Sequence, residues 1–89
     1  MKSVMTVIGP DRVGIIAGVS TLLAELNINI LDLSQTIMNG IFTMTLIVDI
    51  EAANRPFEDI RSALSEHGKA SNLDIRIMRA TTFSAMRSI

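Results

Sequence analysis

The chain has 89 residues, of which 48% are hydrophobic, and its formal net charge at pH 7 is -1. This is the size of one small domain, and the charge is unlike that of a protein that must neutralise nucleic-acid phosphates. The absence of cysteine excludes disulfides, thiolate nucleophiles and cysteine-based metal sites. The first apolar run is too short for a signal peptide, and no segment approaches the roughly 20 apolar residues of a membrane span, so we expect a cytoplasmic protein.

The N-terminal third of the chain predicts a buried strand, a turn and a helix. Residues 2–8 are apolar and β-branched with little alternation, which is typical of a central strand covered on both faces. The strand is expected to break at Gly9-Pro10. From Ile15 to Leu26 the apolar residues recur at helical spacing, which predicts a helix whose single apolar stripe lies on a sheet.

Asn39-Gly40 is the strongest hairpin signal, because a type I′ turn requires a positive φ at both central residues. It joins strands expected at residues 28–38 and 41–50. The resulting register puts Leu31, Leu33 and Ile37 on the face that the helix covers, opposite a mildly polar face. Gln35 falls on the covered face, either as a hydrogen-bonded core amide or in a ligand or interface role.

A second helix is expected at about residues 55–67. Asn54 suits its N-cap, Pro56 suits its first turn, and Gly68 suits a left-handed stop. His67, the single histidine, then lies in the last helical turn, where a role at the helix C-terminus is favoured over metal ligation.

The rest of the chain completes a βαββαβ order. Residues 72–80 alternate in polarity and predict an edge strand exposed on one face, and a short closing helix follows from Thr82. Right-handed crossovers then give an α+β, ferredoxin-like two-layer sandwich with antiparallel strand order 4-1-3-2 and both helices on one face. Because strand 2 has an unpaired edge, we expect a homodimer, and stacking into a higher homo-oligomer stays open.

No group of residues has the pattern of a catalytic, metal or nucleic-acid site. The carboxylates Glu51, Glu58, Asp59, Glu66 and Asp74 are scattered, without a serine, histidine or lysine set that activates a nucleophile. The segment from Gly9 to Gly14 fits neither a dinucleotide nor a phosphate loop, and Phe42 is the only strand aromatic. We therefore expect no enzyme activity, no cofactor and no nucleic-acid partner.

The loop before the first helix is the remaining candidate site. A helix start has unpaired N-H groups and a partial positive charge, so a carboxylate can bind at the amides of Arg12, Val13, Gly14 and Ile15. Asp11 either caps the helix or holds an ammonium group. Arg12 and Gly9 also have simpler interpretations, as a surface charge and as a turn residue.

The segment "GPDRVGIIAGVSTLLAELNINI" resembles the signature of the ACT domain, a strand followed by G-x-D-R-P-G, an apolar helix and an N-I pair. The resemblance covers residues 2 to about 80 and implies one ACT domain over residues 1–89 that senses amino acids between two copies. The ligand positions it implies are Gly9 and Asp11 from one copy and Asn29 from the other, although Asn29 alone reads as a strand-entry residue. Val13 replaces the usual proline, and Asp11 stands where some serine-binding members have asparagine, so the identity of the ligand does not carry over.

These observations predict a homodimeric regulator that binds a small amino acid and signals to a larger protein partner, with no membrane association. The expected ligand-binding residues are Gly9, Asp11, Arg12, Val13, Gly14, Ile15 and Asn29. The alternative is a ligand-free interaction subunit of a larger metabolic enzyme or regulator.

Overall fold

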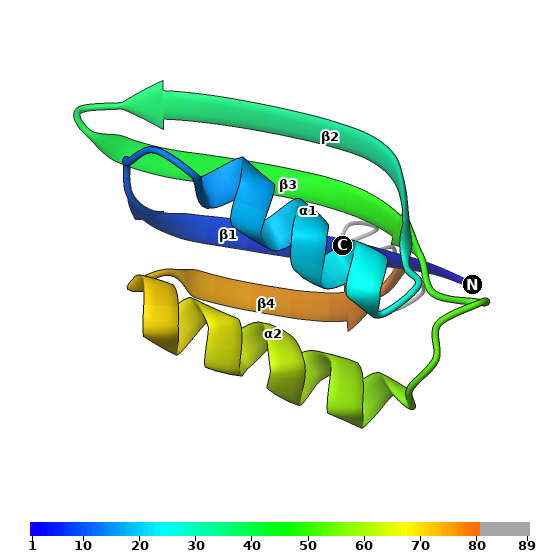
Figure 1. Ribbon diagram of the computed structural model, residues 1–89. Helices are drawn as coiled ribbons and strands as arrows, with labels where there is room; N and C mark the ends of the chain where they lie inside the picture. Colours follow the sequence, from blue (N-terminus) through cyan, green and yellow to red (C-terminus); the bar gives the residue numbers. More distant parts are fainter. Residues whose placement is uncertain (81–89) are drawn as a thin grey trace.

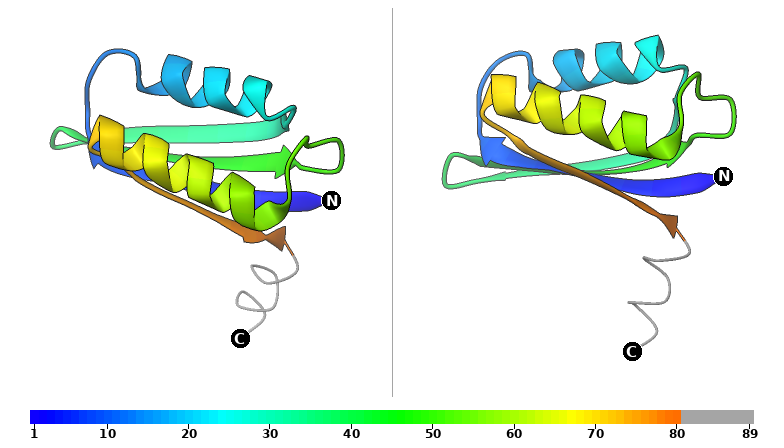
Figure 2. Two further views of the ribbon diagram at one scale, coloured as in Figure 1. Left: turned by 60° about the horizontal axis from the view of Figure 1, so that its bottom comes forward. Right: turned by 90° about the horizontal axis from the view of Figure 1, so that it is seen from below.

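The computed structural model describes residues 1–80, which form a βαββαβ chain (Figure 1). The elements are β1 Lys2–Pro10, α1 Ile15–Glu25, β2 Asn29–Met38, β3 Ile41–Asp49, α2 Phe57–Ser71 and β4 Asp74–Arg79. The antiparallel sheet has the order β2-β3-β1-β4, and both helices lie on one of its faces (Figure 2). This confirms the predicted ferredoxin-like sandwich, while the helix expected after Thr82 lies outside the described residues.

The hydrophobic core lies between the two helices and the inner strands β1 and β3. Met5 of β1 pairs with Leu46 of β3, and both side chains have 0% exposure. Leu23 of α1 and Ile60 and Leu64 of α2 pack onto them. Burial on this scale fixes the inner strands, and the outer strands β2 and β4 form the two margins of the sheet.

The hairpin between β2 and β3 has the predicted turn and most of the predicted register. Asn39 and Gly40 have φ angles of 53° and 76°, as a type I′ turn requires. Leu33 pairs with Leu46, and Ile37, on the same face of the sheet, pairs with Phe42. The turn chemistry alone was therefore enough to align these two strands.

A β-bulge makes the prediction for Leu31 wrong. The pairing with β3 jumps from Ile30 to Asp32, so Leu31 is left outside the ladder with 44% of its surface exposed. Ile30 packs against the core in its place. The bulge could not be predicted from the sequence, because Ile30 and Leu31 are equally apolar and either could face the core.

The helix-facing side of β2 is less buried than the sequence predicts. Leu33 is 37% exposed and Ile37 is 54% exposed. Gln35, which lies between them, is also exposed, so its interpretation as a core amide is wrong. Because β2 has a neighbouring strand on one side only, it lies at the margin of the helix layer.

The second helix ends later than predicted. It runs from Phe57 to Ser71, and the residue in left-handed conformation is Asn72, with φ of 59°. Gly68 is buried inside the helix, and a Cβ there would lie 2.6 Å from the carbonyl oxygen of Leu73. A glycine is needed at this position for the close approach of the chain that enters β4, and not for stopping the helix.

Two polar residues assigned to the ends of α2 have other roles. The Asn54 side chain does not cap α2; its Nδ2 donates a hydrogen bond to the carbonyl of Glu25, 2.9 Å away at the end of α1. His67 lies a turn before the end of α2 and faces α1, where a Cβ on Gly18 would be 3.3 Å from the imidazole. Both residues therefore join the two helices or their connections.

Candidate functional site

A hollow of about 260 Å³ opens between the loop after β1, the first turn of α1 and the end of the hairpin. Its lining consists of Asp11, Arg12, residues 14–17, Gln35, Ile37 and Phe42. One side is polar and carries backbone N-H groups, and the other side is mainly apolar. The volume is below the roughly 300–1,000 Å³ of pockets for drug-sized ligands, which favours a small ligand.

The start of α1 has no side-chain cap within the described part of the chain. Gly14 occupies the N-cap position with φ of 92°, and the first intrahelical bond runs from the N-H of Gly18 to the carbonyl of Gly14. The N-H groups of residues 15–17 therefore have no acceptor within the helix, and they give the start of α1 a partial positive charge. The predicted cap by Asp11 is wrong, and the helix amides begin later than expected.

Asp11 is anchored through its backbone. Its N-H donates a hydrogen bond to the carbonyl of Gly40 in the hairpin turn, at 2.8 Å. Asp11 lines the hollow, and its carboxylate forms no ion pair with any residue in the range 1–80. The loop is thus fixed by the main chain, and the charged group stays available at the rim.

Arg12 and Val13 contribute differently from the expectation that their amides belong to the helix start. The Arg12 Nη2 donates a hydrogen bond to the carbonyl of Ser71, 2.8 Å away at the end of α2. Its charge is well placed there, because the end of a helix carries partial negative charge. Val13 is fully exposed and does not line the hollow.

Gly9 has a packing role. Contrary to the predicted break, β1 continues through Gly9 to Pro10. A Cβ on Gly9 would lie 2.7 Å from the Leu73 side chain and 2.9 Å from the carbonyl oxygen of Asn72. Its lack of a side chain allows β1 to pass close to the beginning of β4, and Gly9 does not line the hollow.

Asn29 lies at the opposite end of α1 from the hollow. It opens β2, pairs with Asp49 and lines a separate surface hollow near Ala52. Since α1 has 11 residues, its two ends are about 16 Å apart. Within one chain, Asn29 and Asp11 therefore do not share a pocket.

The sequence interpretation gave Gln35 a ligand or interface role as one of two alternatives, and it missed Ile37 and Phe42 as parts of the hollow. Gln35 and Ile37 line it together with the buried ring of Phe42. The hairpin register did place all three on the helix-facing side. The missing information was that this side of β2 extends beyond the helix layer, so that these residues face an opening.

The described residues contain no cluster of three or more side chains suited to a metal ion. Neither α1 nor α2, the helices of this part of the chain, is long and apolar enough to cross a lipid bilayer.

Comparisons with known proteins agree with this architecture. The family model of the ACT domain matches residues 3–78. A UPF0237 protein of Listeria innocua is 48% identical over 89 residues, covering 100% of both chains. A UPF0237 protein of the archaeon Pyrobaculum aerophilum is 41% identical over 87 residues, covering 98% of this chain and 97% of the relative.

Solved structures give the same answer. An ACT domain protein from Streptococcus pneumoniae superimposes with a TM-score of 0.83 at 40% identity, and 93% of each chain is covered. A formyltetrahydrofolate deformylase from Pseudomonas syringae has a TM-score of 0.77 at 32% identity, covering 88% of this chain and 27% of that enzyme.

The fold, the loop after β1 and these matches define a regulatory ligand-binding module, and the chain belongs to the ACT domain family. Within that family, the full-length matches place it among the UPF0237 proteins of bacteria and archaea.

Proposed function

We propose that two copies of this chain form a homodimer that binds a small amino acid and passes the bound state to a partner protein. The observation that carries the proposal is the uncapped start of α1, which faces a hollow with Asp11 in its lining. The N-H groups of residues 15–17 suit an α-carboxylate, and Asp11 suits an α-ammonium group. These two charges, a short distance apart, are what every free α-amino acid carries.

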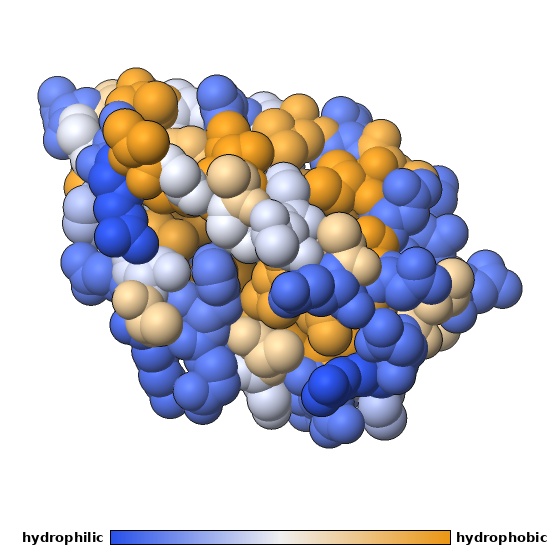
Figure 3. All heavy atoms as spheres, viewed as in Figure 1, coloured by the Kyte–Doolittle hydropathy of each residue, from blue (hydrophilic) through white to orange (hydrophobic). Residues whose placement is uncertain are grey.

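The outer margin of β2 supports a second copy as the other wall of the site. Leu33, Ile37 and Ile16 of α1 are 37%, 54% and 38% exposed, although all three are apolar. Figure 3 shows hydrophobic surface gathered over the upper part of the molecule, where β2 and the start of α1 lie. Antiparallel pairing of two β2 strands about a twofold axis buries this surface.

The same twofold pairing explains the position of Asn29. It sets two α1 helices side by side in opposite directions, so the loop of one copy lies beside the α1–β2 turn of the other. Asn29 of the second copy then closes the pocket over Asp11, which the same chain cannot do. The amide of Gln35 and the apolar Ile37 and Phe42 are left to face the ligand side chain.

Thermal unfolding in the presence of each common amino acid tests the proposal. A ligand at about 100 times its Kd stabilises the folded state by about 2.7 kcal/mol. Asp11→Ala and Asn29→Ala should each abolish the shift and leave the dimer intact. Glu66→Ala, which removes a charge from an exposed position on α2, should keep the shift.

Mixed dimers test whether the two residues act across the interface. A dimer of one Asp11→Ala chain and one Asn29→Ala chain has one intact pocket and one pocket that lacks both groups. We expect binding at half the wild-type stoichiometry, measured by calorimetry. Absence of binding in the mixed dimer would contradict a pocket shared between copies. No response of the wild type to any amino acid would refute the ligand and favour a ligand-free interaction subunit.

A further inference from the structure

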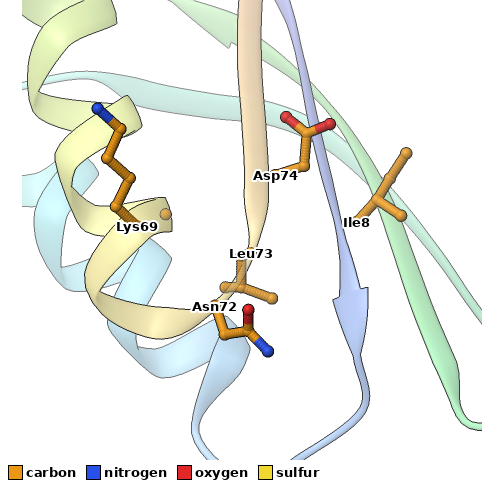
Figure 4. A pocket seen from close by; sticks show the side chains of 6 residues that line it. Ile8, Lys69, Asn72, Leu73 and Asp74 are labelled. Atoms are coloured by element: carbon orange, nitrogen blue, oxygen red, sulfur yellow. The ribbon is translucent and has the colours of Figure 1, made fainter.

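A second groove runs along β4, beside α2. It consists of two adjoining hollows of about 480 and 370 Å³, which share Asp74 in their linings. The first is lined by Arg61, Ser65 and residues 74–78. The second lies by Lys69 near the end of α2 and reaches Ile8 of β1; Figure 4 shows Lys69 on α2 and Asp74 near Ile8 on the other side of β4. The groove therefore follows β4 for most of its length.

The backbone of β4 is available in this groove. Within residues 1–80, β4 pairs only with β1, so the N-H and C=O groups of its other edge have no neighbouring strand. Ile75 and Ile77 turn inward and are 7% and 5% exposed. An added strand would thus meet a row of backbone hydrogen-bonding groups beside a well-packed apolar floor.

The walls of the groove carry basic groups at regular intervals. On α2, Arg61, Ser65 and Lys69 follow each other at every fourth residue, which places them along one side of the helix. On β4, Arg76 has a side chain that is 74% exposed. The guanidinium of Arg79 stands over the Phe57 ring at 4.2 Å and extends the basic surface to the end of the strand.

Two carboxylates partly balance this charge. Glu58 is 3.4 Å from Arg61, and Asp74 is 3.2 Å from Arg76. All four side chains are more than half exposed, and ion pairs of this kind contribute little to stability. Both arginines are therefore free to exchange these partners for carboxylates of a bound segment. The basic margin is notable in a chain whose overall charge is -1.

We propose that this groove binds an extended, acidic segment of a partner protein, which adds to β4 as a further strand. Its backbone would pair with β4, and its carboxylates would meet Arg61 and Lys69 on one face and Arg76 on the other. A second copy of the chain fits less well, because β4 has Asp74 as its single carboxylate, which can pair with Arg76 but leaves Arg61 and Lys69 of α2 without partners. The groove lies on the opposite margin from the proposed amino-acid pocket.

The test uses short fluorescent peptides and the full chain without any amino acid, so that it does not depend on the ligand proposal. A peptide with the repeat Glu-Glu-Val-Val, which places glutamates on both faces of an added strand, should bind, with an affinity that falls as salt is raised. The same peptide with lysine in place of glutamate should not bind. A glutamate peptide methylated on alternate backbone nitrogens should also fail, because it cannot donate to the strand edge.

Variants locate the binding on the chain. Arg61→Gln and Arg76→Gln should each raise the Kd for the glutamate peptide by about two- to fivefold, as expected for the loss of one exposed ion pair. Lys2→Gln removes the same charge from β1 outside the groove and should have no effect. Equal binding of the lysine or methylated peptide, no effect of the arginine variants, tighter binding of single-stranded RNA, or self-association through β4 would each overturn the proposal.

Discussion

Within residues 1–80, both outer strands of the sheet have one edge whose backbone N-H and C=O groups pair with no other strand. The two edges differ in their side chains. The β2 margin presents Leu33 and Ile37, and its one carboxylate, Asp32, is occupied by the backbone N-H of Leu33 at 2.8 Å. The β4 margin presents Arg76 and a basic wall from α2. An apolar margin can be matched by an identical margin, whereas a margin with more basic than acidic groups is matched better by a partner of opposite charge. The difference supports the two proposals made above, self-association through the β2 edge and binding of a different protein at the β4 edge.

The largest effect is expected from charging the β2 margin. Leu33→Lys with Ile37→Lys should convert the dimer to a monomer, because pairing would bury ammonium groups without partners. We expect a loss of about 3 kcal/mol or more, or at least about a hundredfold in Kd, measured by analytical ultracentrifugation. Since both side chains are already partly exposed, the monomer should stay folded by circular dichroism.

The matched control for this variant is on the other margin. Arg76→Glu should leave the dimer Kd unchanged. If it dissociates the dimer while the β2 variant does not, the assignment of the two margins is reversed.

Gly68→Ala should disturb the β4 margin. The new Cβ meets the carbonyl oxygen of Leu73 at 2.6 Å, so the chain entering β4 must move. We expect a net loss of about 1–2 kcal/mol in the free energy of unfolding by urea titration, even though alanine favours helix. Gly18→Ala is the control, since its Cβ meets only the movable His67 ring at 3.3 Å and should be close to neutral. Equal losses in the two variants would refute the close approach at Leu73.

Arg12→Gln should separate a structural role from a ligand-binding role. Loss of the hydrogen bond to the Ser71 carbonyl should cost about 1 kcal/mol in thermal unfolding. The shift caused by an amino acid should keep its size, because the guanidinium is already engaged at the end of α2. Arg55→Gln is the control for charge alone. A lost ligand response in Arg12→Gln would instead make Arg12 part of the pocket.

The smallest effect concerns pH. The pKa of Asp49 lies below its ordinary 3.8, because the Glu51 N-H and the N-terminal ammonium donate hydrogen bonds to it. Its contribution to stability is therefore present above pH 3.8 and lost as the pH falls through the lowered pKa. Asp49 in turn raises the pKa of the Met1 ammonium above 8.0, and that contribution is present below pH 8.0 and lost as the pH rises through the raised value.

Asp49→Asn should remove the pH dependence of the melting temperature at low pH and reduce the one at high pH, because Glu51 also lies 3.5 Å from the Met1 ammonium. Asp59→Asn, at an exposed position, serves as the control. An unchanged pH profile in Asp49→Asn would contradict this pairing.

The fold was predictable because local signals and burial agree. The Asn39-Gly40 turn fixed the register of the hairpin, and the apolar spacing after Ile15 located α1. The exceptions arise where a contact distant in sequence decides. Gly68 was expected to stop α2, but the nearby Leu73 carbonyl is what requires it, and Asn72 takes the left-handed conformation instead. Propensity cannot detect a backbone that passes close in space.

The candidate site was predictable in position but less so in detail. The loop after β1 does meet a hollow, yet Arg12 is drawn to the end of α2 and Asp11 does not cap α1. Both outcomes depend on which segments lie beside the loop after β1 in the fold, namely the end of α2 for Arg12 and the hairpin turn for Asp11. The role of Gln35 depends on the exposure of β2, which in turn depends on how far the helices extend over the sheet.

The bulge at Leu31 divides β2 into two parts of different use. Before it, Ile30 belongs to the core, and after it residues 32–38 lie in one regular run on the surface. A bulge interrupts the hydrogen-bonding pattern of a strand and increases its twist. A further strand could therefore pair regularly with β2 only along residues 32–38. The residue in the middle of this range is Gln35. In the proposed homodimer, symmetric pairing about this residue would place the Gln35 side chains of the two copies opposite each other, at the point where the two proposed pockets come nearest to one another.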